Sequence, residues 1–362
     1  MTGWNVIPTV LKEDNAGSNP FERRLIMKRA RRFVLIGYIL FWGACIKGPT
    51  NNLNTENGTE WLFQANFSSD FLKSIFFVTP QTGYMVGYSE IQWKATIFKS
   101  TDGGQTWQNQ RIAQDSEMLN SVYFIDDQRG WAVGSDGLIL LTTDGGEQWA
   151  LQDSGWAANW NSVFFINESS GWIVGDSILV TDDGGQTWKS QDKGVNAFIS
   201  DIMFIDEQRG WCVGGQGTVL LTQDRGATWV PAESGITELL TAVYFVDAFN
   251  GWAVGSRSTV LTTDDGGLNW TPQSTAYDGH STVFEDVFFP DDQFGWIVGE
   301  GAAMLRTTDG GRTWKYQNVG LVVSFNGVYF ADKDHGWIVG GGWANELYGV
   351  VMRTNSGSRI DE

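Results

Sequence analysis

The chain has 362 residues, of which 42% are hydrophobic and 18% are charged, and this composition excludes an intrinsically disordered chain. Asp and Glu number 42 against 24 Lys and Arg, so the net charge of -18 argues against binding to nucleic acids or to anionic lipid headgroups. The high contents of Gly (45), Phe (22) and Trp (19) are typical of a short unit that is repeated many times.

The first recognisable segment is residues 27–45, which read MKRARRFVLIGYILFWGAC. Its four basic residues precede an apolar run at 33–44, and these 12 residues rise only about 18 Å as a helix, too little for a bilayer core of roughly 30 Å. The pattern predicts a cleaved signal peptide over residues 27–44. The small residues before Cys45 resemble the signal of bacterial lipoproteins, which implies that Cys45 is lipidated and anchors an extracytoplasmic protein to a bacterial membrane. An uncleaved signal anchor is the alternative interpretation.

The segments on either side of this signal peptide predict the domain organisation. Residues 1–26 fit no part of a signal peptide and are interpreted as an extension ahead of the true start at Met27. Residues 45–59 are polar and rich in turn formers, which predicts a flexible tether. Residues 1–44 hold seven Lys and Arg against three Asp and Glu, so their removal changes the net charge from -18 to -22. With only 2 Cys in the chain a disulfide framework is excluded, and Cys212 is predicted to be a small core residue.

One unit is repeated seven times in the rest of the chain. The string G-[WY]-x-V-G begins at residues 83, 130, 171, 210, 251, 295 and 336, with spacings of 39 to 47 residues. A second string of the type T-D-G-G-x-T-W begins at residues 100, 142, 181, 222, 263 and 307, and a degraded copy begins at residue 354. A period of about 40 residues with four strand-like runs per unit predicts an all-β fold, a seven-bladed β-propeller of four-stranded blades over residues 60–362.

The second string predicts a hairpin between the third and fourth strands of each blade. In one copy, Asp144 is expected to accept backbone N–H groups of its own turn, while Gly145 and Gly146 permit positive φ angles. Trp149 then starts the fourth strand. The string resembles the Asp-box, or BNR, motif of β-propellers.

The two ends of the repeat region predict how the ring closes. The seventh unit ends at Glu362 without a fourth strand. Trp61 is followed three residues later by Gln64, a pair that recurs after the Asp-box tryptophans, but no Asp box precedes this copy. We therefore predict that a strand at residues 60–64 completes the last blade and removes the open edges of the sheet.

Seven such units resemble the photosystem II stability/assembly factor family of seven-bladed propellers. The resemblance covers residues 60–362 and implies a non-enzymatic assembly factor that holds a partner protein or peptide on one face of the propeller. It also implies a basic surface patch in the photosynthetic members, and the acidic net charge of this chain departs from that feature.

Asp boxes also occur in sialidases and other propeller glycoside hydrolases, so a glycan-binding or glycan-cleaving propeller is the alternative function. Glycosidases need two carboxylates that flank the scissile bond, or, in sialidases, a Tyr nucleophile with an Arg cluster. Glu285 and Asp286 are the acids expected near the central axis, and no second pair is evident. We therefore predict no catalytic residues and no enzymatic activity.

Eight aromatic residues are predicted to form a partner-binding surface. The loops before the innermost strands and the loops between second and third strands lie on one face of a propeller, and exposed aromatic residues are typical interface anchors. The eight residues are Trp93, Trp156, Trp160, Trp343, Phe198, Tyr277, Phe284 and Phe325. The alternative for some of them is that they plug the central channel together with the residues at the same repeat position, and this set is Leu72, Leu119, Trp160, Ile199, Leu240, Phe284 and Phe325.

A polar ring around the pore is predicted directly behind these residues, with one residue from each blade: Lys73, Asn120, Asn161, Ser200, Thr241, Glu285 and Asn326. The acidic turns of the opposite face are interpreted as solvated surface, and His280 and His335 are too isolated for a zinc site or a catalytic triad. We expect no metal and no cofactor. The expected contacts of this monomeric protein are a protein or peptide partner and a membrane, which it reaches through the lipid anchor, and no nucleic acid.

Overall fold

The computed structural model describes residues 52–54, 60–68, 70–89, 94–110, 118–275, 277, 281–343 and 347–357. The predicted extension, signal peptide and lipidation site at Cys45 lie outside the described residues, and so do Trp93 and His280. Within the described ranges, no helix is long and apolar enough to cross a membrane.

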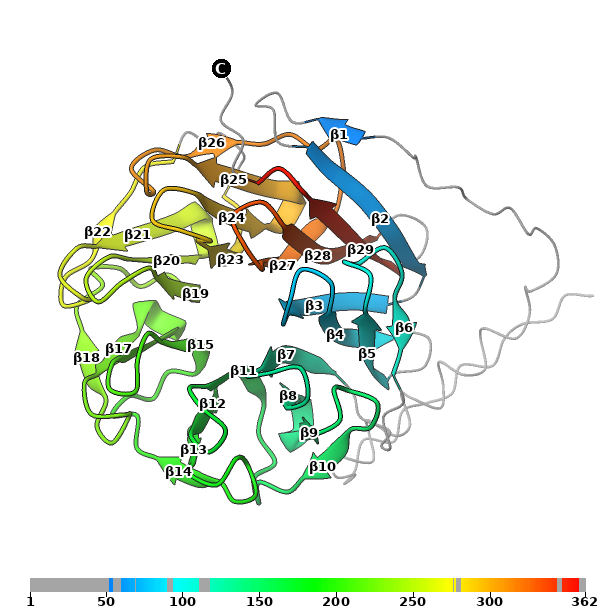
Figure 1. Cartoon of the computed structure of the whole chain (residues 1–362). Helices are drawn as coiled ribbons and strands as arrows, with labels where there is room; N and C mark the ends of the chain where they lie inside the picture. Colours follow the sequence, from blue (N-terminus) through cyan, green and yellow to red (C-terminus); the bar gives the residue numbers. More distant parts are fainter. Residues whose placement is uncertain are drawn as a thin grey trace, which may run out of the picture. The chain divides into compact units, whose positions relative to one another are not determined.

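The described residues form an all-β propeller in which seven sheets surround a central axis (Figure 1). Blades 1 and 2 consist, from the axis outward, of β3 (Asp70–Phe77), β4 (Gly83–Ser89), β5 (Lys94–Ser100) and β6 (Gln108–Asn109), and of β7 (Leu119–Phe124), β8 (Gly130–Gly134), β9 (Ile139–Thr142) and β10 (Ala150–Gln152). Blades 3 and 4 consist of β11 (Trp160–Phe165), β12 (Gly171–Gly175), β13 (Ile178–Thr181) and β14 (Lys189–Gln191), and of β15 (Ile199–Phe204), β16 (Gly210–Gly214), β17 (Val219–Thr222) and β18 (Val230–Ala232). Blades 5 and 6 consist of β19 (Leu240–Phe245), β20 (Gly251–Gly255), β21 (Thr259–Thr263) and β22 (Thr271–Pro272), and of β23 (Phe284–Phe288), β24 (Gly295–Gly299), β25 (Ala303–Thr307) and β26 (Lys315–Tyr316). The predicted fold class is confirmed.

Blade 7 combines the two ends of the propeller sequence. It contains β27 (Ser324–Phe330), β28 (Gly336–Trp343) and β29 (Leu347–Thr354), followed outward by β2 (Glu60–Ser68) and β1 (Asn52–Asn54). β2 pairs antiparallel with β29, so that Leu62 lies opposite Arg353. The predicted closure is therefore confirmed, with a strand longer than residues 60–64. β1, which lies within the expected tether, adds a fifth strand to this blade.

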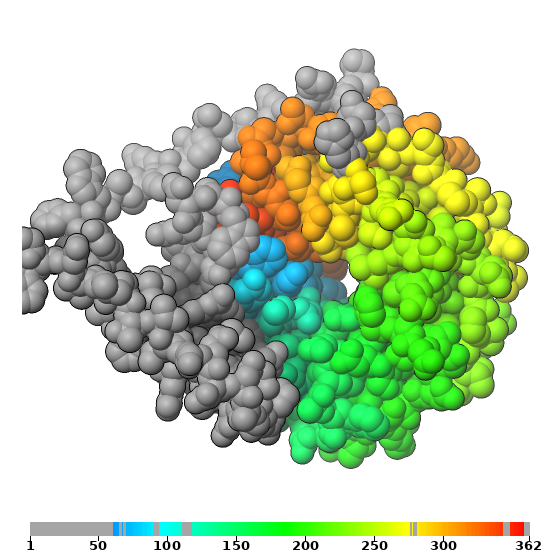
Figure 2. All heavy atoms as spheres, turned by 180° about the vertical axis from the view of Figure 1, so that it is seen from behind, coloured from blue at the N-terminus to red at the C-terminus, as the bar shows by residue number. Residues whose placement is uncertain are grey.

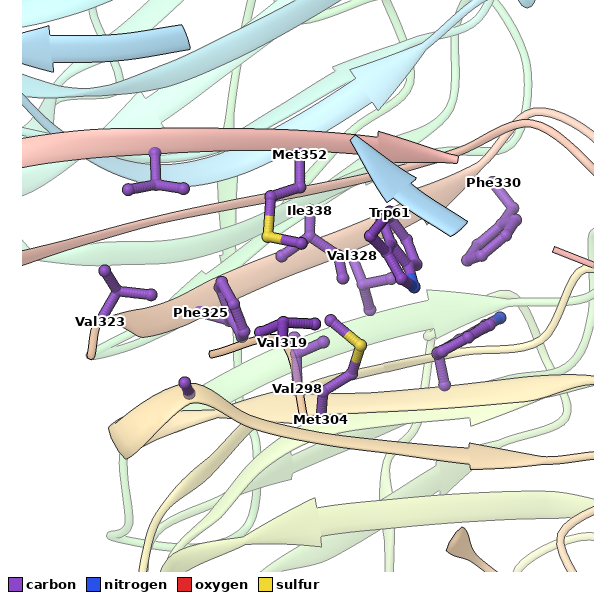
Figure 3. Packing of buried hydrophobic residues seen from close by; sticks show 13 residues of the cluster. Trp61, Val298, Met304, Val319, Val323, Phe325, Val328, Phe330, Ile338 and Met352 are labelled. Carbon is purple, nitrogen blue, oxygen red and sulfur yellow. The ribbon is translucent and has the colours of Figure 1, made fainter. Parts of the chain in front are cut away.

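Trp61 fixes the closing strand to two blades. Its side chain is fully buried, and its ring packs edge-on against Trp296 of blade 6 at 5.3 Å and against Phe330 of blade 7 at 6.1 Å between centroids. Figure 3 shows Trp61 pointing from β2 toward Val328 and Phe330. Burial of one Trp removes roughly 150–250 Å² from water, a gross stabilisation of about 4–6 kcal/mol. Seen from behind in Figure 2, the blue residues of blade 1 lie between the orange residues of blade 7 and the green residues of blade 2.

The G-W-x-V-G strands build the contacts between neighbouring blades. Trp131 of blade 2 stacks on Phe165 of blade 3 with ring centroids 3.5 Å apart, and Trp188 of the blade 3 Asp box meets the edge of the same ring at 6.0 Å. Gly171 leaves room for Phe165, because a Cβ at residue 171 would lie 2.4 Å from the phenyl ring. The repeat therefore places a Phe between two Trp residues at a blade boundary, and this arrangement explains the aromatic composition.

The Asp boxes form the predicted hairpin turns. Asp144 accepts the backbone N–H of Gln148 at 2.9 Å and the hydroxyl of Thr142 at 2.9 Å. Gly145 and Gly146 have φ angles of 68° and 82°. In blade 3, hydrogen bonds from the side chain and backbone of Thr187 lower the pKa of Asp183 to about 2. These carboxylates are therefore used to hold turns, as the sequence predicts.

Candidate functional site

Every innermost strand carries a β-bulge at the same position, and the bulge residues are the seven residues of the predicted polar ring. In β11, for example, the register shifts between Trp160 and Ser162, so that Asn161 is the extra residue. A bulge twists the strand and redirects its side chains, which breaks the two-residue alternation at the mouth of the propeller.

Four residues of the polar ring hold neighbouring blades together. Each donates a side-chain hydrogen bond to the backbone carbonyl that precedes the bulge of the next blade. The four bonds are Asn120 to Trp160 at 2.8 Å, Asn161 to Ile199 at 2.8 Å, Thr241 to Phe284 at 2.6 Å and Asn326 to Leu72 at 2.7 Å. We call these four bonds the blade clasps. The last of them joins blade 7 to blade 1 and therefore adds to the closure of the ring.

Lys73 and Glu285 give the polar ring one charged sector. Burial lowers the pKa of Lys73, while the charges of Glu285 and Glu300 raise it. Burial likewise raises the pKa of Glu285, and Lys73 counteracts that shift. The Lys73 ammonium also lies 5.0 Å from the ring centroid of Phe71. Because these charges are partly withdrawn from water, they interact more strongly than fully exposed charges would.

Two aspartates lie one residue beyond the ring and link further blades. Asp201 accepts the hydroxyl of Ser162 at 2.8 Å from blade 3 and the N–H of Val243 at 3.0 Å from blade 5. Asp286 accepts the N–H of Val328 at 2.9 Å from blade 7, and its other oxygen accepts the N–H of Val287. Burial, together with the charge of Asp201, raises the pKa of Asp286 to about 8. Both oxygens of Asp286 thus accept hydrogen bonds within the fold.

A collar of six aromatic residues and Met203 surrounds the axis three residues after each bulge. All seven of its residues are partly exposed, and they are Phe76, Tyr123, Phe164, Met203, Tyr244, Phe288 and Tyr329. Phe76 lies 5.1 Å from Tyr123 and 4.9 Å from Tyr329 between ring centroids, so the collar is continuous across the closing blade boundary. The collar was not predicted from the sequence, although its constant spacing of three residues from the polar ring is visible there.

Trp160, Phe284 and Phe325 belong to the core and are not part of an exposed surface. Each has a relative exposure of 0%. Trp160 packs with Trp131 of the preceding blade, and Phe284 and Phe325 pack in the same way against their preceding blades. The bulge explains the difference, because it breaks the alternation of the strand, and the residue before it packs against the neighbouring blade. These three side chains therefore fill blade boundaries.

Trp156 and Phe198 are exposed, with relative exposures of 46% and 45%. Trp156 occupies the repeat position at which Val195 and Ile236 pack against the core, seven residues after the Asp-box Trp. Tyr277 occupies the same position, is partly buried, and lies 5.4 Å from Tyr316 between ring centroids. The Trp93 residue and the Trp343 side chain lie outside the described part of the structure.

At four blade boundaries, backbone hydrogen bonds place the loop before the innermost strand beside the turn between the second and third strands of the preceding blade. The bonds run from Gly137 to Ala158, Gly217 to Glu238, Ser258 to Thr282 and Ala302 to Val323. We call this surface the loop face, which comprises residues 135–137, 153–159, 176–177, 192–198, 215–217, 233–239, 256–258, 281–283, 300–302 and 318–323.

The loop face is acidic. It holds two basic residues, Lys193 and Arg257, against seven acidic ones, Asp136, Asp153, Asp176, Asp192, Glu233, Glu238 and Glu300. Within the described residues, no group of three or more His, Cys, Asp or Glu side chains is arranged to hold a metal ion. The loop face therefore exposes aromatic and acidic side chains.

Comparison with known proteins agrees with this architecture. A family profile described as "Photosynthesis system II assembly factor YCF48" matches residues 54–156 and 231–321. The "Photosystem II assembly lipoprotein Ycf48" of Synechococcus sp. (strain CC9902) is 31% identical over 77 residues, which are 21% of this chain and 22% of that protein. The chloroplastic "Photosystem II stability/assembly factor HCF136" of Arabidopsis thaliana is 31% identical over 75 residues, 19% of this chain and 17% of that protein. The matched stretch thus spans about a fifth of these relatives.

Solved structures show the same fold. The structure of "YCF48 bound to D1 peptide" superposes with a TM-score of 0.65 at 23% identity and covers 82% of this chain and 97% of that one. The structure of "YCF48 from Cyanidioschyzon merolae" superposes with a TM-score of 0.66 at 20% identity and covers 82% of this chain and 98% of that one. At these identities the likeness concerns the arrangement of the blades.

Proposed function

Because the chain belongs to the photosynthesis system II assembly factor YCF48 family, we propose that it is a non-enzymatic assembly factor that holds a partner protein or peptide on the loop face. The family match supports a role in assembly, and one of the similar solved structures is of YCF48 bound to a D1 peptide. The proposal places the contact on Trp156 and Phe198, and it includes Trp93, Trp343 and Tyr277 as further anchors.

The exposure of Trp156 is the single observation that carries this proposal. Its counterparts Val195, Ile236, Tyr277 and Leu321 pack against the core, whereas 46% of Trp156 remains exposed. Fold stability gains little from an indole in this position. Exposed Trp and Tyr side chains are the usual anchors of protein interfaces, because they bury a large area with few rotatable bonds.

We further propose that the protein acts outside the cytoplasm, held to a bacterial membrane by a lipid on Cys45. The apolar run at 33–44 and the small residues before Cys45 support this location. The name of the Synechococcus relative, which includes the word lipoprotein, is consistent with it.

The test is partner capture by the full chain with and without the two exposed aromatic residues. The variant W156A/F198A is expected to lose binding of a D1 peptide, or of proteins from a solubilised membrane extract, at an unchanged melting temperature. Phe249→Ala is the matched control, because Phe249 is 61% exposed and lies in a turn outside the loop face. If W156A/F198A captures the partner as well as Phe249→Ala does, the loop face is not the binding surface. Release of defined saccharides that Glu285→Gln abolishes would instead establish the glycan-cleaving alternative.

A further inference from the structure

The loop face contains a cavity of about 520 Å³ between the loops that precede β15 and β19. The cavity is lined by Val195, by residues 216–219 and by residues 231–238. Val195 and Ile236 pack against the cores of blades 4 and 5, so they form an apolar floor. A floor of this kind suits the aliphatic part of a side chain.

The charged residues at the cavity are acidic. Glu233 and Glu238 line it, and none of its described lining residues is a Lys or Arg. Of the two basic side chains of the loop face, Lys193 donates a hydrogen bond to the carbonyl oxygen of Asp176 at 2.7 Å. Arg257 lies 3.7 Å from one oxygen of Glu238, whose other oxygen accepts the N–H of Thr237 at 3.1 Å. Glu238 is therefore partnered within the fold, which leaves Glu233 as the carboxylate for an incoming cation. Glu233 is exposed at the cavity and accessible to an incoming cation.

Phe198 lies next to the cavity, in the loop that also supplies Val195. Its ring packs beside Gly215, where an added Cβ would lie 3.0 Å from the phenyl edge. An exposed aromatic ring therefore adjoins an acidic cavity with an apolar floor.

We propose that this cavity takes a lysine or arginine side chain of the partner, with its aliphatic stem on Val195 and Ile236 and its cation at Glu233. The partner residue next to this lysine or arginine in sequence packs on Phe198. This inference rests on the proposed function and specifies its partner as a protein segment with a basic residue. The acidic loop face favours the approach of such a segment, because opposite charges steer association and set specificity.

The test uses the full chain in detergent and a set of labelled hexapeptides, capped at both ends, that differ at one central position. That position is arginine, lysine, norleucine or glutamate, and binding is followed by fluorescence anisotropy up to millimolar peptide. Exposed ion pairs are weak, so we expect the arginine and lysine peptides to bind about twofold to fivefold more tightly than the norleucine peptide. Glutamate is expected to prevent binding.

Two single variants locate the preference. E233Q is expected to bind the arginine and norleucine peptides equally. D153N removes the same charge from the loop face outside the cavity and keeps the oxygen that accepts the N–H of Gly155, so its preference is expected to persist. Equal loss in both variants, equal binding of arginine and norleucine by the wild type, or no binding at all would overturn the cavity assignment.

The same samples separate this inference from the proposed function. If the peptides show no preference for a cation but partner capture still depends on Trp156 and Phe198, the cavity assignment is wrong and the assembly-factor proposal stands. If partner capture is independent of Trp156 and Phe198, the loop-face proposal is wrong whatever the peptides show.

Discussion

Trp131 and Trp156 show how one residue type serves two regions of this propeller. Trp131 is 0% exposed and stacks at 3.5 Å on Phe165 of the next blade, in a position that the repeat fills with an aromatic ring in every blade. Trp156 is 46% exposed and stands where other blades carry Val195 or Ile236. The comparison teaches that the repeat position of an aromatic residue indicates its role better than its residue type does.

Substitution of the buried Trp131 at the blade boundary is expected to have the largest effect on the free energy of unfolding. Trp131→Ala leaves a cavity against Phe165 and is expected to lower the free energy of unfolding by about 3–5 kcal/mol. Denaturant unfolding followed by circular dichroism measures this change. Trp156→Ala serves as the control and is expected to stay within about 0.5 kcal/mol of the wild type. Similar losses in the two variants would remove the distinction between the two regions.

The pH dependence of stability probes the buried acids that link the blades. The folded-state pKa of Asp286 is about 8, above the ordinary value of 3.8. Between these two pH values the folded protein therefore binds more protons than the unfolded chain, and the free energy of unfolding falls as pH rises. Asp286→Asn is expected to remove part of this slope between about pH 5 and pH 9, as measured by thermal unfolding.

Asp201 and Glu285 also have raised pKa values, so part of the slope persists in this variant. Asp153→Asn, on the loop face, is the control and should keep the full slope. A wild type whose stability does not fall over this pH range would contradict the raised pKa of Asp286.

The blade clasps lie between the two regions and have an intermediate expected effect. Asn120→Ala removes the donor to the carbonyl oxygen of Trp160 and should destabilise the fold by about 1–2 kcal/mol. Ser200 occupies the same ring position, and no clasp from its side chain is seen in the described structure. Ser200→Ala is therefore the matched control, with an expected change below about 0.5 kcal/mol in chemical denaturation. Equal effects at the two positions would argue that the ring acts only through its backbone bulge.

The sequence predicted those features that the repeat determines directly. Seven blades, the Asp-box turns and the closure through Trp61 follow from spacing alone, since each depends on a residue type at a fixed offset. The roles of Trp160 and Asn161 could not be read in this way. The bulge at Asn161 turns two neighbouring side chains to different surroundings, and a strand alternation inferred from sequence contains no bulge.

Substitution of the exposed Trp156 on the loop face is expected to have the smallest effect on stability and a clear effect on partner binding. Trp156→Val gives blade 3 the residue type that blade 4 has as Val195, which packs against the core. The free energy of unfolding is expected to change by less than about 0.5 kcal/mol, because an exposed indole is exchanged for a side chain that the repeat accommodates. Partner affinity is expected to fall about tenfold or more, as is usual when an aromatic anchor is lost. Affinity and melting temperature measured on the same sample check both claims, and a variant that binds as well as the wild type would show that the exposure of Trp156 has no role in binding.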